Sequence, residues 1–587
     1  MDNCRDAVKK RKNQPPGEPL GCPGFALLPM KNKLPLYFLT IPLGFLALFY
    51  FLPLARILAL GLGSPWQASA GANVSRIADV VAFTLLQAGA SAGLTLLLGI
   101  PAGYLFYRYD FPYKKLLYLA TAVPFMLPTV VVASGFNGLL GPSGVFNWLY
   151  KLASGQPQPL FAFTGTLWAI FAAHVFYNAT IVIRMVRGSL ERQDPSLEYA
   201  ARTLGASPIR AFVEITLPRL LPAIIVSAFF VFFFDFTSFG VVLMLGGSKF
   251  ATLEVEIFTQ TMRFLNLPFA AVLSLVQILF TLAFSLLYGR LLAGAGDAPS
   301  QRIRWATARL PVGQVEKIAV RTGILLVAAF FTLPVIALPI RSFTSFESVL
   351  RGGGLGSLFT LDHYLGLFSN PRDSYFYVPP AAAIQNSLLF GAGAVLLSIL
   401  IGLPTALLLS RRRWLQRWAE PVFVLPLGTS SVTLGLGYIL FFNVALPGGQ
   451  NLLTSPWLLP FAHTAIALPF VIRNLLSALD TIPQSYYEAA KVLGASGIKT
   501  LTSIDLPLLR RPLVSSAAFA FTISLGEFGA TSLLARPEYP TLPTAIYRLI
   551  SQPGAANYGQ AMAMSTLLFA LCAVAISFIE QDSRQGF

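Results

Sequence analysis

Long apolar runs fill most of the chain and alternate with short polar segments. A helix that crosses a bilayer needs about 20 mostly apolar residues. Runs of that length predict twelve such helices in two sets of six, and therefore an all-α polytopic membrane protein. Prolines inside several of these runs, at Pro101, Pro124, Pro128 and Pro404, predict kinks rather than breaks. The predicted helices are 34–60, 80–107, 116–139, 160–183, 220–245 and 268–292, then 318–340, 383–410, 420–444, 456–478, 512–535 and 559–580.

The two sets of helices are copies of one another. Residues 204–207 (LGAS) recur 289 positions later, and the same offset relates short motifs at 182–184, 217–218, 239–240 and 252–253 to their counterparts. The motif at 99–101 recurs at an offset of 303, which indicates a local difference in length. A register held through loops and helices predicts two homologous halves in the same orientation, related by an axis along the membrane normal. The expected organisation is a basic tail at 1–33, a first half at 34–295, a linker at 296–317 and a second half at 318–587.

Composition agrees with a membrane protein. Of 587 residues, 55% are hydrophobic and 11% are charged, and the mean hydropathy is +0.66. Soluble domains carry about 25% charged residues, so soluble, disordered and disulfide-scaffold classes are excluded. The three cysteines are too scattered for a disulfide framework or a thiolate metal site.

The net charge of +17 reports topology. If the N-terminus is cytoplasmic, 32 of the 42 Lys and Arg residues fall in cytoplasmic segments and 9 in outer loops. This distribution follows the positive-inside rule and predicts that both termini are cytoplasmic, with the first helix as an uncleaved anchor. The basic residues then face membrane lipid and cytoplasm, and a nucleic-acid partner is unnecessary.

The longest repeated polar segments lie on the basic side, between the fourth and fifth helices of each half, at 191–220 and 480–511. Each has Pro and Ser near its start, helix formers in the middle and then Gly. This pattern predicts a short helix closed by a glycine turn and followed by a second short helix. The small Ala pair in each segment allows another backbone to approach closely, so the pattern favours a protruding docking helix.

These two loops resemble the EAA loop of permease subunits of binding-protein-dependent ABC importers. That pattern is Glu-Ala-Ala, three residues, Gly and later Ile-x-Leu-Pro. The second half matches it fully, whereas the first has Tyr199 where Glu is expected and Glu198 one place earlier. The resemblance implies that the loops couple the membrane helices to a separate ATPase. The residues it singles out are Glu198, Ala200, Ala201, Gly205, Glu488, Ala489, Ala490 and Gly494.

The resemblance also implies partners. A homodimer of ATP-binding subunits would dock at the coupling loops. A periplasmic or extracellular substrate-binding protein would dock at the outer loops near 246–267, 341–382 and 536–558. The chain would reside in a bacterial inner membrane. The sequence has no G-x-x-x-x-G-K-[ST] phosphate loop, so ATP and Mg²⁺ would be bound by the partner. This chain is then expected to be no enzyme, to need no cofactor and to have no metal site.

A fused twelve-helix permease resembles thiamine permeases and ferric-iron permeases over nearly its whole length. The segment 524–530 (SLGEFGA), followed by 541–543 (TLP) and by Ile546 and Tyr547, is closer to the thiamine group. Its GEFGA portion also occurs in molybdate and sulfate permeases, which are usually unfused. Thiamine is therefore the favoured solute, with ferric iron as the alternative.

Two acidic residues are candidates for the translocation pathway. Asp235 lies in the fifth predicted helix and Glu527 in the eleventh, and a carboxylate at membrane depth is costly unless it has a role. The repeat places them about one turn apart along equivalent helices, where they would favour a cation. The alternative is that each is hydrogen-bonded to a neighbouring helix or lies near the outer water boundary. His174 is expected to be a satisfied interhelical residue, and His363 and His463 are isolated in sequence.

Two other classes of protein remain open. An ion-coupled secondary transporter can also have twelve helices in two parallel repeats, but it would not require a pair of matched docking loops. A scaffold or membrane-embedded enzyme has no catalytic constellation in this sequence to support it.

Overall fold

The computed structural model describes residues 39–63, 70–156, 158–194, 196–294, 308–350, 352, 355–369, 380–443 and 451–584. Throughout these residues the regular structure is helical, and the β-type contacts are two isolated bridges. The all-α expectation is therefore confirmed. The expected basic tail at 1–33 and most of the expected linker at 296–317 lie outside the described residues.

Ten helices in the described part are long and apolar enough to cross a membrane, which confirms a polytopic protein. All six expected helices of the first repeat are among them, and four of the second. They are Thr40–Gly63, Val74–Arg108, Thr129–Ser154, Leu167–Arg192, Pro208–Phe236, Leu267–Leu287, Gln314–Ser342, Pro380–Ser410, Leu458–Asp480 and Ala555–Phe578.

The ninth and eleventh expected helices are interrupted. The ninth consists of α20 (Arg413–Val424) and α21 (Ser431–Phe442), which a 3-10 turn separates. The eleventh runs as α25 (Leu506–Gly526) and resumes as α26 (Gly529–Leu534). α20 and α21 have 12 residues each, whereas α25 has 21 and is long enough to cross a membrane but is not among the ten apolar candidates.

At two of the four positions proline does not break its helix, as expected. Pro101 lies within α4 (Ala70–Arg108) and Pro404 within α19 (Pro380–Ser410), and both helices continue through it.

At two other positions the expectation of a kink is wrong. Pro124 stands in the first turn of α6 (Val123–Met126), and Pro128 is the residue before α7 (Thr129–Leu140). Proline lacks an N–H and disfavours helical dihedrals in the residue before it, so two prolines this close end one helix and start another. The third helix of the first repeat therefore begins at α7, and it is extended on its far side by α8 (Val145–Ser154).

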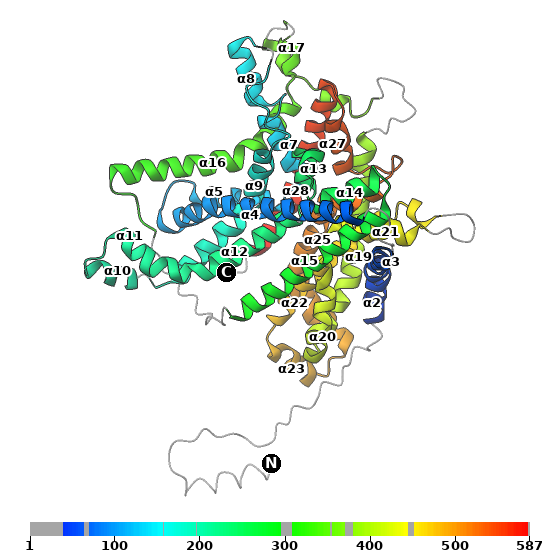
Figure 1. Cartoon of the computed structure of the whole chain (residues 1–587). Helices are drawn as coiled ribbons and strands as arrows, with labels where there is room; N and C mark the ends of the chain where they lie inside the picture. Colours follow the sequence, from blue (N-terminus) through cyan, green and yellow to red (C-terminus); the bar gives the residue numbers. More distant parts are fainter. Residues whose placement is uncertain are drawn as a thin grey trace, which may run out of the picture.

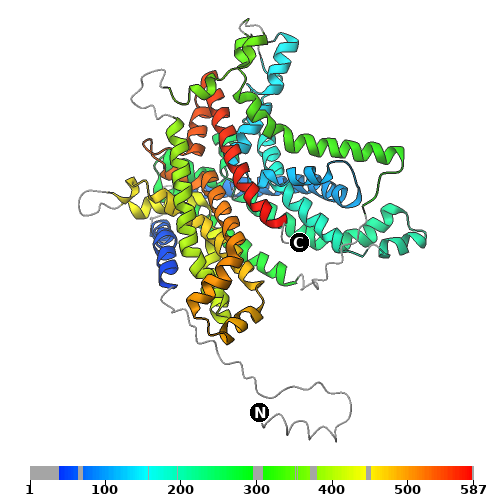
Figure 2. The ribbon, with the colours of Figure 1, turned by 180° about the vertical axis from the view of Figure 1, so that it is seen from behind.

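The two repeats are interlocked through their first helices. α3 (Leu52–Gly63) packs on α21 of the second repeat as well as on α15 (Leu267–Gly294) of its own. In the same way, α16 (Gln314–Ser342) packs on α7 of the first repeat as well as on α28 (Ala555–Arg584). Figure 1 shows the dark blue α3 beside α21, and Figure 2 shows the red α28 in the middle of the molecule. Each repeat therefore completes the other.

Two repeat-related glycines permit this exchange. A Cβ on Gly135 in α7 would lie 2.6 Å from the carbonyl oxygen of Pro334 in α16. A Cβ on Gly437 in α21 would lie 3.0 Å from the carbonyl oxygen of Pro53 in α3. The backbones approach too closely for a larger residue at either position, so the same contact is built twice.

Candidate coupling surface and translocation pathway

The predicted pair of short helices is present on both repeated loops. In the first repeat α10 (Ser196–Thr203) is followed by α11 (Pro208–Ala211), and in the second α23 (Gln484–Val492) is followed by α24 (Gly497–Thr500). A π-helical turn then leads into the fifth helix of each repeat. Figure 1 shows α10 and α23 at two separate extremities of the molecule, where a partner could reach both.

Glycine closes each of these helices in a left-handed conformation. Gly205 has φ of +93° and Gly494 has φ of +72°. In the first repeat the N–H of Gly205 donates to the carbonyl of Arg202 at 3.1 Å, and the N–H of Ala206 donates to that of Ala201 at 3.0 Å. This double hydrogen bond is the Schellman motif, which favours Gly at the left-handed position. In the second repeat, Gly494 and Ala495 make the same two bonds to Lys491 and Ala490, so the geometry requires the glycine in both loops.

Apolar side chains at equivalent positions are exposed just after these glycine-closed helices. Leu204 is 89% exposed and its counterpart Leu493 is 85% exposed. Ile209 and its counterpart Ile498 are each 77% exposed. Exposed apolar residues that gather at one place indicate a protein contact surface. The sequence reasoning missed these four residues, although apolar residues repeated within polar loops were a signal for them.

The two acidic residues that the resemblance singles out, Glu198 and Glu488, are not equivalent. Glu488 is exposed on α23, beside the exposed Ala489. Glu198 is half-buried on α10, and the hydroxyl of Thr216 lies 3.5 Å from its Oε2. The offset of 289 aligns Glu198 with Tyr487 rather than with Glu488. Glu198 therefore faces the rest of its own half, whereas Glu488 faces outward.

The first candidate pathway acid, Asp235, lies fully buried in α12 (Leu217–Phe236). The amide of Asn178 donates to Asp235 Oδ1 at 2.7 Å, and His174 Nδ1 lies 3.4 Å from the same oxygen. The histidine also contacts Gln87 Nε2 at 2.9 Å and Ser238 Oγ at 2.8 Å. Helices α4, α9 (Leu167–Arg192) and α12 thus meet at one buried network, and His174 is satisfied between helices as expected.

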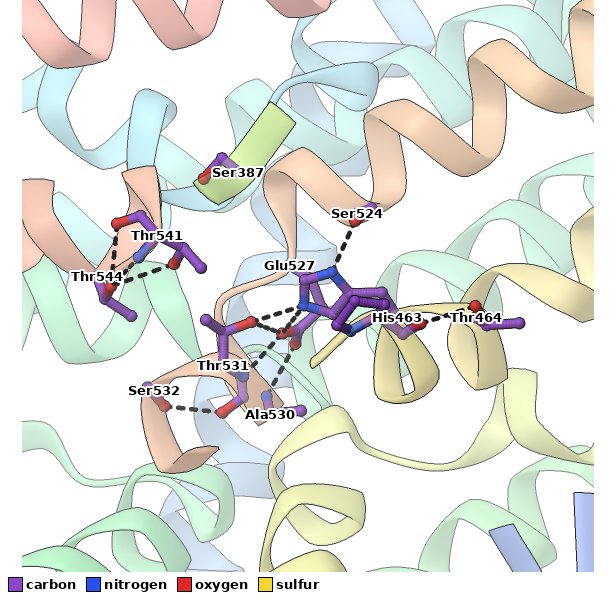
Figure 3. A network of polar contacts seen from close by, with 12 residues as sticks. Ser387, His463, Thr464, Ser524, Glu527, Ala530, Thr531, Ser532, Thr541 and Thr544 are labelled. Atoms are coloured by element: carbon purple, nitrogen blue, oxygen red, sulfur yellow. Dashed lines mark hydrogen bonds and ion pairs between the residues drawn. The ribbon is translucent and has the colours of Figure 1, made fainter. Parts of the chain in front are cut away.

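The second candidate acid, Glu527, lies at the break between α25 and α26 (Figure 3). Its carboxylate accepts from the backbone N–H groups of Ala530 and Thr531, both at 2.8 Å, and from the Thr531 hydroxyl at 2.5 Å. His463 in α22 (Leu458–Asp480) lies 3.7 Å from Glu527 Oε2 and 2.7 Å from Ser524 Oγ. The carboxylate therefore satisfies N–H groups at the start of α26.

The two networks are repeat-related. His174 and His463 are 289 positions apart, and each contacts the two aligned sites of the fifth helix of its repeat. Those sites hold Asp235 and Ser238 in the first repeat, and Ser524 and Glu527 in the second. Each half thus has one His and one acid, with the acid moved by about one turn. The structure places the two acids in separate networks. The repeat offset, which aligns His174 with His463, was the sequence signal that could have revealed these networks.

A third buried acid joins the two repeats. Glu254 in α14 (Leu253–Met262) accepts from the Ser430 hydroxyl at 2.5 Å and also from the Gln277 amide. Ser430 belongs to the second repeat, where it is the residue before α21. The sequence reasoning placed 246–267 in an outer loop, but α14 within that segment is buried. Glu254 was missed because a segment of this length between two apolar runs reads as a loop.

Aromatic residues occupy the junction between the repeats. Phe239 and Phe528 are buried and stack with ring centroids 5.4 Å apart. Phe258 lies 5.3 Å from Phe239, and Tyr547 lies 5.5 Å from Phe528. Phe239 and Phe528 are related by the sequence repeat, so this stack brings together the same position of both halves.

Residues 96–294 and 394–581 each match the family described as "Binding-protein-dependent transport system inner membrane component". The chain belongs to this family. One match falls in each sequence repeat, which confirms a permease with two halves fused in one chain. Each matched range contains one coupling loop and one of the two histidines with its neighbouring acid.

Three relatives of this chain are likewise named as transport permeases. The chain is 30% identical over 444 residues to "Probable ABC transporter permease protein y4fN" of Sinorhizobium fredii, covering 74% of this chain and 75% of the relative. It is 29% identical over 548 residues to "Thiamine transport system permease protein ThiP" of Brucella abortus, covering 90% and 93%. It is 26% identical over 553 residues to ThiP of Haemophilus influenzae, covering 92% and 95%.

The permease units begin inside α4 and α19, so the exchanged helices α3 and α16 lie outside the family match.

Among the described residues, no group of three or more His, Cys, Asp or Glu side chains could hold a metal ion.

Proposed function

We propose that this permease is the membrane component of a thiamine importer. The observation that carries the proposal is that thiamine permeases align with 90% or more of the chain, through both repeats and both coupling loops. The aromatic stack at the junction of the repeats supports an organic cation, because aromatic faces attract cations that have shed water. Asp235 and Glu527 would add negative charge along the same fifth helices when the halves separate.

Energy would come from a homodimer of ATP-binding subunits, which hold ATP and Mg²⁺. Two identical grooves in such a dimer require two similar docking elements, and α10 and α23, each followed by matching exposed apolar residues, supply them. From the distribution of basic residues we infer that these loops and both termini are cytoplasmic and that the chain resides in a bacterial inner membrane. This chain then makes and breaks no covalent bond.

Transport would proceed by alternating access of the two halves. Closure of the ATP-binding subunits would draw α10 and α23 together and separate Phe239 from Phe528. A substrate-binding protein would deliver the solute at the outer face. Because α14 and α27 (Leu542–Ser551) fold inward there, their exposed flanks around Phe264, Leu265 and Glu538 are what such a partner would meet.

Reconstitution tests the proposal. The permease would be co-purified with its ATP-binding subunit, placed in liposomes, and given binding protein loaded with thiamine or with ferric iron. We expect thiamine alone to stimulate ATP hydrolysis and uptake. Stimulation by iron and not by thiamine would overturn the solute. Uptake without an ATPase, abolished by an uncoupler, would overturn ATP coupling.

A further inference from the structure

A buried carboxylate ties the second coupling helix to the membrane helices. Asp505 ends the π-helical turn Leu501–Asp505 and is fully buried. The hydroxyl of Tyr487 on α23 donates to Asp505 Oδ1 at 2.8 Å, and Arg411, just after α19, pairs with Oδ2. One carboxylate therefore joins the coupling helix, the base of the fifth helix and the end of the second helix.

The first half joins the same three places with different residues. Arg108 at the end of α4 is buried, and its side chain hydrogen-bonds Tyr199 on α10, next to Glu198. Thr216, which ends the π-helical turn Phe212–Thr216, places its hydroxyl 3.5 Å from Glu198 Oε2. An offset of 303 aligns Arg108 with Arg411, and an offset of 289 aligns Thr216 with Asp505.

The alignment shows that the acid and the hydroxyl have traded places. In the first half the coupling helix supplies the acid, Glu198, and the π-helical turn supplies the hydroxyl, Thr216. In the second half the helix supplies the hydroxyl, Tyr487, and the turn supplies the acid, Asp505. Each half keeps one guanidinium and one carboxylate, so the charge at each site is the same, and the first half has an additional hydroxyl, Tyr199, on Arg108.

We infer that each half carries a polar clamp of one Arg and one carboxylate with hydroxyl partners, which fixes the coupling helix against the second and fifth membrane helices, and that the carboxylate works from either position. The inference rests on the proposed coupling to an ATPase. Its members are positioning residues, since they face inward while Glu488 faces outward. Removing one partner leaves a buried charge without its counterpart, so the coupling helix loses its fixed angle.

Tyr487 is suited to donate a hydrogen bond to Asp505. Burial raises the pKa of its phenol, and the hydrogen-bonded Asp505 carboxylate raises it further. The phenol therefore stays protonated and keeps donating at neutral pH. The clamp can then follow the coupling helix as a unit when an ATPase moves it.

The test transplants the first arrangement into the second half. The variants are Asp505→Thr, Tyr487→Glu and the double variant Y487E/D505T, each in the full permease with its ATP-binding subunit and binding protein. The readouts are thiamine moved per ATP hydrolysed and the midpoint of thermal unfolding. We expect each single variant to lower the transport ratio about tenfold and the double variant to recover most of it, as contacting residues are strongly non-additive.

A merely structural role would lower the unfolding midpoint of D505T and leave the transport ratio unchanged, and that result would overturn the clamp. So would a double variant as impaired as the single ones. If D505T fails to assemble, the reciprocal pair E198Y/T216D in the first half is judged by the same ratio. Absence of thiamine-stimulated hydrolysis in the unaltered protein would instead overturn the proposed solute, so the two failures are distinguishable.

Discussion

Phe239 and Phe528 occupy the same position in the two sequence repeats and stack on one another, with their ring planes inclined by 30°. Contacts between repeat-related residues lie at the pseudo-symmetry axis, where the two halves can separate. Both rings are buried in this conformation. The relationship makes the stack the natural place to look for a barrier to the solute.

Replacing this stack should open a leak. We expect Phe528→Ala to raise passive thiamine efflux from proteoliposomes without ATP and to destabilise the protein by about 3–5 kcal/mol, the usual cost of truncating a buried Phe. The matched control is Phe442→Ala, because Phe442 is similarly buried but packs against Phe49 beside the exchanged helix α3 and not against the Phe239–Phe528 stack. Similar destabilisation with equal leak in both variants would contradict the barrier.

The glycine turns of the coupling loops should be intolerant of substitution. Gly494→Ala would force a side chain into a left-handed conformation at a cost of about 1–2 kcal/mol, and Gly494→Pro would also remove the N–H that closes the helix. We expect the proline variant to insert in the membrane and to lose transport-coupled ATP hydrolysis. A bulky residue at Ala489 should do the same, because that side chain is exposed on the docking helix. Gly313→Ala is the control, since Gly313 has an ordinary φ and open space around it.

The exposed apolar residues of the loops should hold the ATPase. We expect Leu493→Asp together with Ile498→Asp to reduce co-purification of the ATP-binding subunit at least about tenfold, because a charge buried in an interface without a partner costs several kcal/mol. The equivalent change at Leu204 and Ile209 should weaken binding similarly. Leu310→Asp is the control, an exposed apolar residue outside the loops. Undiminished co-purification of both loop variants would show that the ATPase binds elsewhere.

The hydrogen bond between Glu254 and Ser430 should stabilise the junction of the repeats. Ser430→Ala removes a donor to Glu254 and also the acceptor for the N–H groups of Val432 and Thr433, so a loss of about 1–3 kcal/mol is expected. Glu254→Ala should leave both of its donors unsatisfied at a similar cost. Thermal unfolding of the single and double variants measures the coupling, and additive losses would mean that the pair contributes no joint stability.

The helices follow from the sequence because apolar length is a local property. Every expected span has a helical counterpart, and the deviations occur where packing or backbone chemistry acts on single residues. Pro124 and Pro128 break a run of ample hydropathy because each removes an N–H and constrains its neighbour. α14 was read as part of a loop because its acids look like solvent-facing residues until Ser430 and Gln277 are placed beside one of them.

The candidate site also has features that the sequence predicts and features that only the structure shows. The coupling loops were found by their repeat, and the glycine turns follow from spacing alone. The partners of Asp235 and Glu527 could not be read from one helix, since His174 and His463 come from another helix in each half. The aligned positions of Glu198 and Tyr487 were visible in sequence, but the role of Asp505 between Tyr487 and Arg411 was not.

The sequence by itself determined an all-α membrane protein built twice from one unit, with a coupling loop in each half, because hydropathy, helix capping and repetition are encoded along the chain. Only the tertiary structure decided that α3 and α16 are exchanged between the halves and that Phe239 meets Phe528. It also decided that the carboxylate beside the coupling helix comes from that helix in the first half, as Glu198, and from the π-helical turn in the second, as Asp505. These features depend on which surfaces approach within a few ångströms. Packing decides which surfaces meet, and it brings together residues that are nearly three hundred positions apart in the sequence.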